Sequence, residues 1–453
     1  MFENKKIHMI GIGGVSMSGI ADILLSFNCT ITGYDAKEND LTKKLVLKGV
    51  NICYEPCIEN VDNADIIVYT AAIKDDNPEL AHAKKTNKEL YERSTFFGLM
   101  MKSYKNVLCI SGTHGKSTTT GMVSTIFVKA DMDPTIQLGA TLPIIGGNAR
   151  IGGKEFFIAE ACEYVDSFLS FFPTAEVILN VDNDHLDYFG NLDNIIKSFN
   201  RYTKLLPENG YLVVNNDDEN SLMACKDAEK KITYGIENTS AYMAKNIEFD
   251  EYGHPRYDLY VNNTFELKVE LSVSGKHNVY NSLAAIALSH QYINDLKVIV
   301  EALKDYTGVG RRFELLGKIN DNVLVYDDYA HHPSEIATTL ESVKKTKHNK
   351  NIAIFQPHTY SRTKDHLEEF AKVLSGFDNI IIATIYAARE ENIYGVSEDQ
   401  LVKLIKENGN DNVRYIDSFE KIEEYIKENI DDNDLVITIG AGPVNEVAKN
   451  LVK

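Results

Sequence analysis

The sequence contains no tryptophan, and it has only ten prolines and six cysteines in 453 residues. No apolar run approaches the roughly 20 residues that a membrane-spanning helix requires, and the N-terminal residues do not resemble a secretory signal peptide. The cysteines form neither a CxxC pair nor a metal-ligand spacing, so we expect free, reduced thiols and no disulfide framework. These features favour a protein of the cytoplasm that does not interact with membranes.

Acidic residues outnumber basic ones by 66 to 47, which gives a formal net charge of −19. A surface of that sign repels nucleic acids and anionic membranes, so we expect no nucleic-acid partner. Small phosphorylated molecules can still bind where hydrogen-bond donors gather in local pockets. With 44% hydrophobic and 25% charged residues, the composition is that of a folded globular protein. Both a monomer and a homodimer are compatible with it.

Alternating apolar runs and helical patterns divide the chain into three blocks. Residues 1–105 and 313–453 repeat the strand–helix–strand alternation of a parallel, Rossmann-like sheet. Residues 106–312 combine a P-loop-type α/β core with a period-two stretch between 242 and 273, which indicates antiparallel strands. The predicted fold class is therefore α/β, in three domains. Strands are expected at residues 7–10, 30–34, 65–69, 106–110, 156–159, 177–181, 323–326, 352–355, 380–383 and 435–439, and helices at 20–27 and 278–293.

The segment Ser111–Thr118 lies between a predicted strand and a predicted helix, which is the context of a phosphate-binding loop. Glycines there let backbone N–H groups face phosphate oxygens, and the helix N-terminus adds positive potential. Lys116 would reach the β- and γ-phosphates of a nucleotide, and the Ser117 hydroxyl would bind Mg²⁺. Ile110 stands where the general pattern has a glycine, so an ordinary glycine-rich turn with one exposed lysine is the alternative.

Acidic residues follow the next two predicted strands of the same block. Glu160 comes directly after an apolar strand, where burial without a cation would be costly, so we predict a magnesium ligand there. Glu163 and Asp187 are more typical of capping or surface acids. His185 lies in the acidic run 182–187 at the end of a further strand, where side chains face the ligand crevice of an open α/β sheet.

A first glycine turn, Gly11–Ser16, follows the first predicted strand and precedes a helix, and Asp35 ends the next strand. This pattern is typical of dinucleotide binding, with the acid on a ribose hydroxyl. Ser16 replaces the third glycine, which weakens a nicotinamide assignment but is compatible with a pyrophosphate site. A purely structural turn is the alternative.

Together the motifs resemble those of the Mur ligases of bacterial cell-wall synthesis, in the right order and over essentially the whole chain. A double histidine and a Phe-Gln-Pro-His run are similar to those of the branch that adds the first amino acid. The stretches that carry the resemblance are Gly11–Gly14, Gly112–Ser117, the Glu160 segment, Asp184–His185, Gly275–Asn281, Gly310–Phe313, Asp327–Pro333 and Phe355–Thr363.

The resemblance implies a UDP-sugar domain, an ATP and Mg²⁺ domain, and a domain that brings the amino acid. ATP would phosphorylate the carboxylate of UDP-N-acetylmuramate, and the amine of L-alanine would attack the acyl phosphate. Catalytic roles are implied for Lys116, Glu160, His185, His331 and His332, with the three histidines as candidate general bases, and metal ligation for Ser117, Glu160 and His185. ATP contacts are implied for Gly112, Thr113, His114, Gly115, Lys116, Ser117, Thr118, His277, Asn278, Asn281, Arg312 and Asp328. Substrate contacts are implied for Gly11, Gly13, Gly14, Val15, Ser16, Met17, Ser18, Asp35, Thr70, Ala71 and Arg362.

Two positions depart from the family pattern. Thr359 stands where an arginine often precedes the Tyr-Ser-Arg segment, so Arg362 would act alone on the alanine carboxylate, which its planar fork suits. Residues 198–201 hold no lysine, whereas other branches carry a carbamylated lysine there. Three rivals stay open: a recycling ligase that adds a whole tripeptide to the same UDP-sugar, an NAD-dependent oxidoreductase, and a regulatory P-loop NTPase.

Overall fold

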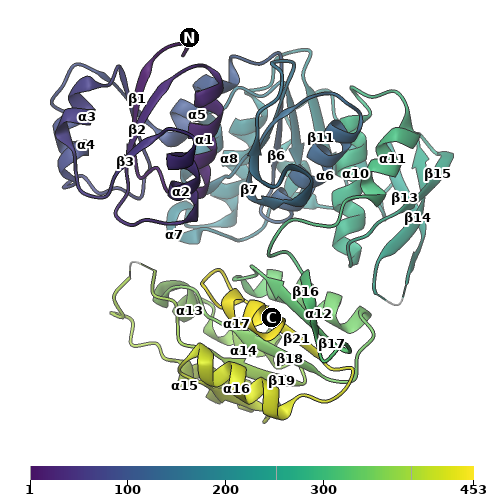
Figure 1. Cartoon of the computed structure of the whole chain (residues 1–453). Coiled ribbons are helices and arrows are strands. Elements are labelled where there is room, and N and C mark those ends of the chain that lie inside the picture. The colour runs from purple at the N-terminus through teal and green to yellow at the C-terminus, as the bar shows by residue number, and fades with distance from the viewer. Residues whose placement is uncertain (1, 251, 389) are drawn as a thin grey trace. The chain divides into compact units, whose positions relative to one another are not determined.

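The computed structural model describes residues 2–250, 252–388 and 390–453, which form two compact units (Figure 1). The N-terminal unit comprises the chain to Asn246 together with Tyr257–Glu270 and Val279–Thr307. The C-terminal unit comprises Ile247–Arg256, Leu271–Asn278 and Gly308–Lys453. Within the described ranges, every helix is too short or too polar to cross a membrane.

Five strands form the first sheet of the N-terminal unit in the order β3-β2-β1-β4-β5, and every neighbouring pair is parallel. This confirms the predicted parallel sheet. In helix α1 (Val15–Ser26), Ile20, Ile23 and Leu24 are all buried, as their spacing predicts. The other elements are β1 (Lys6–Ile10), β2 (Thr30–Tyr34), α2 (Asp40–Leu47), β3 (Asn51–Cys53), α3 (Ile58–Asn63), β4 (Ile66–Tyr69), α4 (Pro78–Ala83), β5 (Glu89–Glu92) and α5 (Arg93–Met101).

A second sheet has ten strands in the order β15-β14-β13-β12-β11-β10-β6-β9-β7-β8. Strand β6 (Asn106–Ser111) pairs in parallel with β9 and β10 and leads into helix α6 (Lys116–Lys129). The strands expected between residues 242 and 273 are present as the adjacent β13, β14 and β15. The remaining strands are β7 (Thr135–Leu142), β8 (Gly147–Arg150), β9 (Phe156–Glu160), β10 (Ala175–Ile178), β11 (Tyr211–Asn215), β12 (Ile232–Gly235), β13 (Tyr242–Phe249), β14 (Pro255–Val261) and β15 (Thr264–Glu270). The helices are η1 (Pro143–Ile145), η2 (Tyr164–Ser170), α7 (Leu186–Phe189), α8 (Leu192–Thr203), α9 (Glu219–Ala224), α10 (Lys276–Ser289) and α11 (Leu296–Lys304).

The third sheet, in the C-terminal unit, has the order β16-β17-β21-β18-β19-β20, and β16 alone runs antiparallel to its neighbour. Helices α12, α14 and α15 contribute to one hydrophobic cluster of this unit, and α16 and α17 contribute to another. The sheet is thus covered on both faces, as expected for a doubly wound fold. The elements are β16 (Glu314–Ile319), β17 (Val323–Asp328), α12 (Pro333–Lys345), β18 (Asn351–Phe355), α13 (Tyr360–Asp365), α14 (Leu367–Leu374), β19 (Asn379–Ile382), α15 (Glu398–Glu407), β20 (Val413–Tyr415), α16 (Phe419–Asn429), β21 (Leu435–Ile439) and α17 (Asn445–Leu451).

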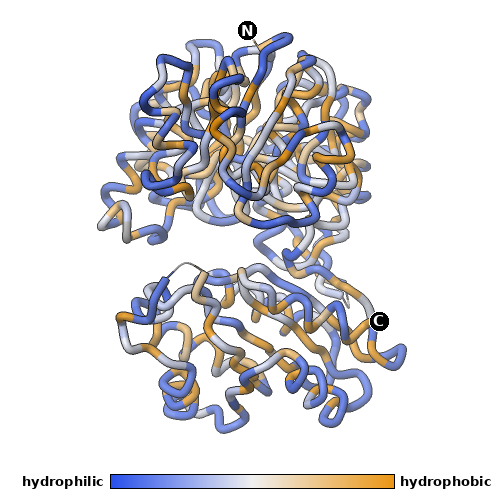
Figure 2. The backbone as a smooth tube through the Cα atoms, turned by 60° about the vertical axis from the view of Figure 1, so that its left-hand side comes forward, coloured by the Kyte–Doolittle hydropathy of each residue, from blue (hydrophilic) through white to orange (hydrophobic). Residues whose placement is uncertain are grey.

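The first two sheets share one hydrophobic core. Phe97 of α5 contacts the rings of Phe157 and Phe171, with centroids 5.5 and 5.4 Å away. A Cβ atom at Gly98, the next residue, would overlap the carbonyl oxygen of Ser170. Backbone therefore meets backbone where α5 packs on η2. Figure 2 shows hydrophobic and hydrophilic segments alternating along the backbone of the chain.

One predicted strand is too long. The strand expected at residues 177–181 is β10, and it ends at Ile178. Asn180 leaves the sheet because its carbonyl oxygen accepts a hydrogen bond from the N–H of Thr113, at 3.0 Å. The chain thus turns from the sheet edge towards the predicted phosphate loop.

Candidate active site

The predicted phosphate loop connects β6 to the first turn of α6. Gly115, the N-cap residue of α6, adopts a left-handed conformation with φ 85°. A Cβ atom there would also lie 2.7 Å from Oδ1 of Asn281, so glycine is required for both reasons. Asn281, which the sequence predicts to contact ATP, therefore lies against the loop.

Asn180 holds the loop from the neighbouring strand end. Its Oδ1 accepts the N–H of His114 at 2.7 Å, and its Nδ2 donates to the carbonyl of His114 at 3.0 Å. The Thr113 hydroxyl accepts the N–H of Asp182 at 2.9 Å. Asn180 is not among the predicted site residues, although its position at the end of a strand beside the acidic run could have indicated it.

The ammonium group of Lys116 is held by oxygen atoms of the loop and of Glu163. Its Nζ donates to the carbonyls of Gly112 and Thr113 at 2.6 and 2.9 Å and lies 3.0 Å from Oε2 of Glu163. Burial alone would lower the pKa of Lys116, but Glu163, with Cys162 and Glu160 nearby, raises it above its ordinary value. The ammonium is therefore fully charged at neutral pH.

Glu163 is a buried partner of this lysine and not a surface or helix-capping acid, contrary to the expectation from sequence. Its side chain is only 2% exposed, and that of Lys116 is 15% exposed. An acid so well buried needs a cation beside it, and Lys116 supplies one.

Ser117 and Glu160 bring together two oxygen ligands of the kind that Mg²⁺ prefers. The Ser117 hydroxyl donates to Oε1 of Glu160 at 2.8 Å, and the N–H of Gly139 donates to Oε2. In the described ranges, no group of three or more His, Cys, Asp or Glu side chains is arranged to hold a metal. The pair therefore fits an ion that takes one or two protein oxygens and completes its shell with phosphate and water.

His185 is the N-cap residue of α7 and has φ 53°. Its ring lies against that of Tyr164, with centroids 4.5 Å apart, and its Nε2 is 3.8 Å from Oδ2 of Asp184. The side chain of the nearby Asp187 lies outside the described residues. The structure thus places His185 in an aromatic and acidic setting and leaves its role in metal binding a prediction.

In the segment 198–201, which holds no lysine, Ser198 and Arg201 contact Asp166. Asp166 accepts hydrogen bonds from Ser198, from Arg201 at 3.2 Å and from the Tyr188 hydroxyl at 3.2 Å. Val165 and Asp166 both have positive φ, 51° and 57°. A positive φ is rare for a β-branched residue such as valine. These bonds hold the η2 segment in a strained backbone conformation beside His185.

The first glycine turn is closed by side chains from the same sheet. The N–H of Gly13 donates to Oδ2 of Asp35 at 2.8 Å, and Asn39 Nδ2 donates to the carbonyl of Gly13 at 3.2 Å. Thr70 lies against Gly11, Ala71 is exposed, and Met17 and Ser18 are buried within α1. Of the predicted residues, Gly13 and Asp35 are therefore brought together, as are Gly11 and Thr70, whereas Met17 belongs to the hydrophobic core.

Two polar side chains from other elements reach this turn and are not among the predicted residues. Arg93, the first residue of α5, has Nη1 3.3 Å from the hydroxyl of Ser16. Asn148 of β8 donates to the carbonyl of Val15 at 2.8 Å. Arg93 places a cation beside a turn that has no lysine of its own, and no sequence motif linked it to the turn.

In the C-terminal unit, Asp328 ends β17 and is buried. Burial raises the pKa of Asp328 to about 6, although Arg312, the Thr339 hydroxyl and the N–H of Ala330 favour the charged form. The Thr339 hydroxyl donates to Oδ2 of Asp328 at 2.8 Å, and Arg312 lies 3.5 Å from Glu335. Asp328 and Arg312, both predicted to contact ATP, thus belong to one network of hydrogen bonds and charges.

The tandem histidines have different environments. His332 caps α12: its Nδ1 is 2.7 Å from the Ser334 hydroxyl, and Glu335 completes a capping box. His331 Nδ1 is 2.9 Å from the carbonyl of Tyr329, and burial lowers the pKa of His331. Burial therefore favours the neutral form of His331, which a general base requires, although Glu335, 3.4 Å from Nδ1, opposes this shift. His332 has a structural task.

A third histidine, His358, lies between Arg362 and His331 and contacts both. Arg362 Nη1 is 3.5 Å from His358 Nδ1, and the His331 and His358 ring centroids are 5.9 Å apart. Burial, together with His331 and Arg362, lowers the pKa of His358 to about 4. His358 is not a predicted site residue, although it lies in the Phe-Gln-Pro-His run.

His277 and Asn278, which the sequence predicts on the adenine side, also belong to the C-terminal unit. Burial, and secondly the charge of Lys345, lower the pKa of His277 to about 4. Asn278 Nδ2 donates to the carbonyl of Ser274 at 2.7 Å. A neutral imidazole and an anchored amide suit hydrogen bonding to a neutral base.

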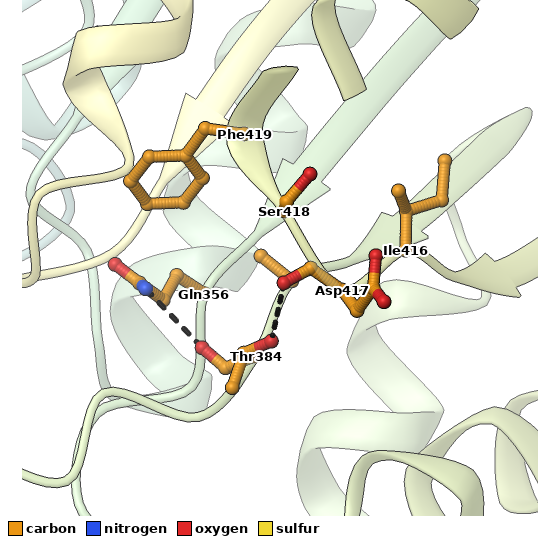
Figure 3. A pocket seen from close by; sticks show the side chains of 7 residues that line it. Gln356, Thr384, Ile416, Asp417, Ser418 and Phe419 are labelled. Atoms are coloured by element: carbon orange, nitrogen blue, oxygen red, sulfur yellow. Dashed lines mark hydrogen bonds between the residues drawn. The ribbon is translucent and has the colours of Figure 1, made fainter. Parts of the chain in front are cut away.

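The same unit has a separate pocket of about 230 Å³ where the chain leaves β18, β19 and β20 (Figure 3). The side chain of Gln356 donates to the backbone carbonyl of Thr384 at 3.2 Å. The Thr384 hydroxyl in turn donates to the backbone carbonyl of Asp417 at 3.1 Å. None of the residues that line this pocket is a predicted site residue.

Three family models match the chain: the catalytic domain of the Mur ligase family over residues 6–105, the Mur ligase middle domain over 110–289, and the Mur ligase glutamate ligase domain over 311–442. The chain therefore belongs to the Mur ligase family, and the fold predicted from its sequence is confirmed.

Individual relatives that match nearly the whole chain indicate one branch of the family. A UDP-N-acetylmuramate–L-alanine ligase of Caldanaerobacter subterraneus is 48% identical, over 99% of this chain and 97% of its own. One of Clostridium botulinum is 47% identical over the same shares. The crystal structure of UDP-N-acetylmuramate–alanine ligase from Thermotoga maritima matches with a TM-score of 0.84 and 27% identity, covering 99% of this chain and 98% of that chain. A murein peptide ligase from Psychrobacter arcticus has the same fold, with a TM-score of 0.72 and 24% identity over 99% of this chain and 98% of that chain.

Proposed function

We propose that this chain is an ATP-dependent ligase that joins L-alanine to the carboxylate of UDP-N-acetylmuramate and releases ADP and phosphate. The observation that carries the proposal is the charged Lys116 in a phosphate loop, in a chain 48% identical to a ligase named for these two substrates. The product would be a precursor of peptidoglycan.

A carboxylate does not condense with an amine unaided, because its oxygen is a poor leaving group. Transfer of the γ-phosphoryl group to the muramoyl carboxylate solves this by forming an acyl phosphate. Lys116 and the loop N–H groups would stabilise the charge of the moving phosphoryl group, chiefly by positioning. When bound, Mg²⁺ neutralises phosphate charge. Ser117 and Glu160 would hold this ion, and His185 is a candidate ligand for a second one.

The amine of L-alanine must lose a proton before it attacks the acyl phosphate. We assign the general base to His331 in preference to His332, because His332 is engaged in capping α12 while burial favours the neutral form of His331. His185 remains the alternative. Arg362, in the same unit as His331, would bind the carboxylate of the amino acid.

Each of the three blocks of the sequence would bind a different substrate. Residues 1–105 would bind the UDP-sugar, with its pyrophosphate on the turn Gly11–Ser18 and its nucleoside near Asp35. Residues 106–312 would bind ATP, and residues 313–453 would bring the amino acid.

The test is phosphate release with ATP and Mg²⁺, with and without UDP-N-acetylmuramate, across a panel of amino acids and the tripeptide. We expect release only when the UDP-sugar and L-alanine are both present. Use of the tripeptide in place of free alanine would indicate the recycling ligase. Hydrolysis that ignores the UDP-sugar would indicate a regulatory NTPase, and NAD binding at the first turn would favour the oxidoreductase.

A further inference from the structure

The backbone is strained in two segments that contact each other, η2 and the start of α7. Val165 and Asp166, adjacent residues of η2, lie in the left-handed region with φ 51° and 57°, and His185 at the N-cap of α7 has φ 53°. A β-branched residue rarely adopts such an angle. Strain of this kind persists only where the surrounding structure fixes it, and it gathers at active sites and ligand clamps. The groups that fix η2 are therefore candidates for a role in the reaction.

The carboxylate of Asp166 collects the hydrogen bonds that fix this backbone. Ser198 and Arg201 of α8 and the hydroxyl of Tyr188 in α7 donate to it, the last two at 3.2 Å. Three donors from two helices thus converge on a side chain that is 24% exposed. A partly exposed ion pair adds little stability by itself, so we interpret the convergence as a means of holding η2 in place.

Asp166 is connected on one side to the lysine of the phosphate loop. Its N–H donates to the backbone carbonyl of Glu163 at 2.9 Å, and the carboxylate of Glu163 lies 3.0 Å from Nζ of Lys116. The turn that begins at Glu163 is therefore closed by the residue whose side chain the two helices hold. A shift of Asp166 would move the turn from which the partner of Lys116 extends.

On the other side, Asp166 is connected to two aromatic neighbours of His185. Tyr164, two residues before Asp166, has its ring centroid 4.5 Å from that of His185. Tyr188 donates its hydroxyl to Asp166 and its N–H to the carbonyl of His185, at 3.2 and 3.0 Å, and its ring centroid lies 6.3 Å from that of Tyr164. The imidazole of His185 thus rests against a ring whose backbone is held by Asp166.

We propose that Asp166 is a positioning residue of the ligase reaction, which fixes the imidazole of His185 relative to Lys116 through the η2 backbone and the ring of Tyr164. The roles of His185 and Lys116 in the reaction rest on the proposed function, whereas their placement by Asp166 rests on the contacts alone. Because Asp166 acts through His185 and the UDP-sugar is assigned to the first glycine turn, its loss should lower kcat and leave the KM for UDP-N-acetylmuramate unchanged.

The placement is tested by NMR on the full-length protein with ¹³C-labelled histidine rings. The signal of His185, assigned by its loss in His185→Gln, should carry a ring-current shift that Tyr164→Leu removes. Asp166→Asn keeps an acceptor oxygen and the tolerance of asparagine for a positive φ, but it loses the charge and one acceptor. We expect it to move the His185 signal towards its position in Tyr164→Leu. Tyr188→Phe, which removes one of the three hydrogen bonds, should move the signal less and in the same direction.

Asp227→Asn is the matched control. Asp227 lies 3.0 Å from Nζ of Lys204, the C-cap residue of α8, so the substitution removes the same charge from a carboxylate paired with the other end of the same helix. It should change neither the His185 signal nor kcat. Thermal melts establish which variants are folded, and if Asp166→Asn is not, Tyr188→Phe decides the question. An unmoved His185 signal in the deciding variant, or an equal shift in Asp227→Asn, would overturn the placement.

The role in the reaction is measured as kcat for alanine-dependent phosphate release. Asp166→Asn should lower kcat by about tenfold or more, because a small misplacement of a catalytic group can cost up to about 10²-fold. In a Tyr164→Leu background the same substitution should lower kcat by about twofold or less, because the ring that transmits the effect is absent. Equal effects in both backgrounds would overturn the positioning role, since a general loss of structure is additive. Wild-type protein that releases no phosphate with L-alanine refutes the proposed function, while the NMR result stands on its own.

Discussion

The N-terminal unit contains two glycine turns with the same strand–turn–helix plan and different contents. At Gly11–Ser16 the carboxylate of Asp35 accepts the N–H of Gly13, and the only cation described beside the turn, Arg93, reaches it from another element. At Gly112–Ser117 the turn encloses Lys116, whose charge is balanced by the buried Glu163. The first arrangement suits holding a phosphorylated ligand in place, and the second suits stabilising charge that moves during a reaction. The strand–turn–helix plan is what the two proposed phosphate sites share, and the Lys116–Glu163 pair is the feature that would distinguish the proposed catalytic turn from the proposed binding turn.

Removing the charge from the second turn should have the largest effect. We expect Lys116→Met to reduce kcat by about 10²–10³-fold or more, because one preorganised charge at a transition state is worth that much. The substitution also leaves Glu163 buried without a partner, which costs about 3–5 kcal/mol of stability. Alanine-dependent ADP release measures the first effect and thermal unfolding the second. The double variant Lys116→Met with Glu163→Gln should recover stability but not activity; near-normal turnover in either variant would refute the assignment of the loop.

Removing the partner of the lysine should have a smaller, pH-dependent effect. Glu163 raises the pKa of Lys116, so Lys116 keeps its proton to higher pH than an ordinary buried lysine. In Glu163→Gln that pKa falls, and the alkaline limb of the kcat profile should move to lower pH, with activity below the limb reduced by about tenfold. The stability that comes from the raised pKa of Lys116 is present at neutral pH and is lost as pH rises through the pKa of Lys116 in the folded protein. An alkaline limb that does not move would show that Lys116 is not the group that titrates.

Crowding the first turn should affect substrate binding alone. A Cβ atom at Gly13 would lie 2.7 Å from Oδ2 of Asp35 and 2.8 Å from the Asn39 amide, whereas at Gly14 the nearest atom is 3.7 Å away. Gly13→Ala should therefore raise the KM for UDP-N-acetylmuramate by about tenfold, equivalent to about 1.4 kcal/mol, with the KM for ATP unchanged. Gly14→Ala is the comparison: its methyl group would meet no protein atom nearer than 3.7 Å, so it should raise this KM less than Gly13→Ala does and leave the KM for ATP unchanged. Equal effects of the two substitutions would contradict this account of the turn.

The smallest effect is expected from the cation beside the first turn. Arg93→Ala should raise the KM for UDP-N-acetylmuramate by a few-fold, and Arg93→Lys should restore part of the loss, since a lysine keeps the charge without the planar fork. Raising the salt concentration should diminish the difference between Arg93→Ala and wild type, because partly exposed charges are screened. If Arg93→Ala instead lowered kcat and left KM unchanged, Arg93 would act in the reaction step. The first turn would then no longer differ from the second in serving only substrate binding.

The sequence predicts the sheets well because apolar runs and glycine turns report local structure. Strands such as β6 and β17 and the inward face of α6 follow from periodicity alone. The sequence does not predict the burial of Glu163, because an acid after a strand is ordinarily solvated. Its lysine partner, moreover, is 47 residues away along the chain. The loop-holding role of Asn180 likewise depends on a parallel pairing that brings distant strand ends together.

The tandem histidines His331 and His332 show a second reason why the sequence predicts less of the site than the structure shows. The sequence leaves His331 and His332 equivalent as candidate bases, because both follow a strand end. The helix start signal was nevertheless present: Pro333 at the first helical position and Glu335 two residues later are typical of a capped N-terminus. Capping rules, applied to histidine as well as to serine and aspartate, would have separated the two.

The packing at Gly98 has a mechanical consequence. Where α5 meets η2, two backbones touch with no side chain between them, so there is no flexible layer on which one sheet of the N-terminal unit could slide past the other. A methyl group at position 98 would act as a wedge at this joint. We therefore expect the first two sheets to move as one rigid part, which leaves the loops around the two glycine turns to supply any motion that this unit needs during turnover.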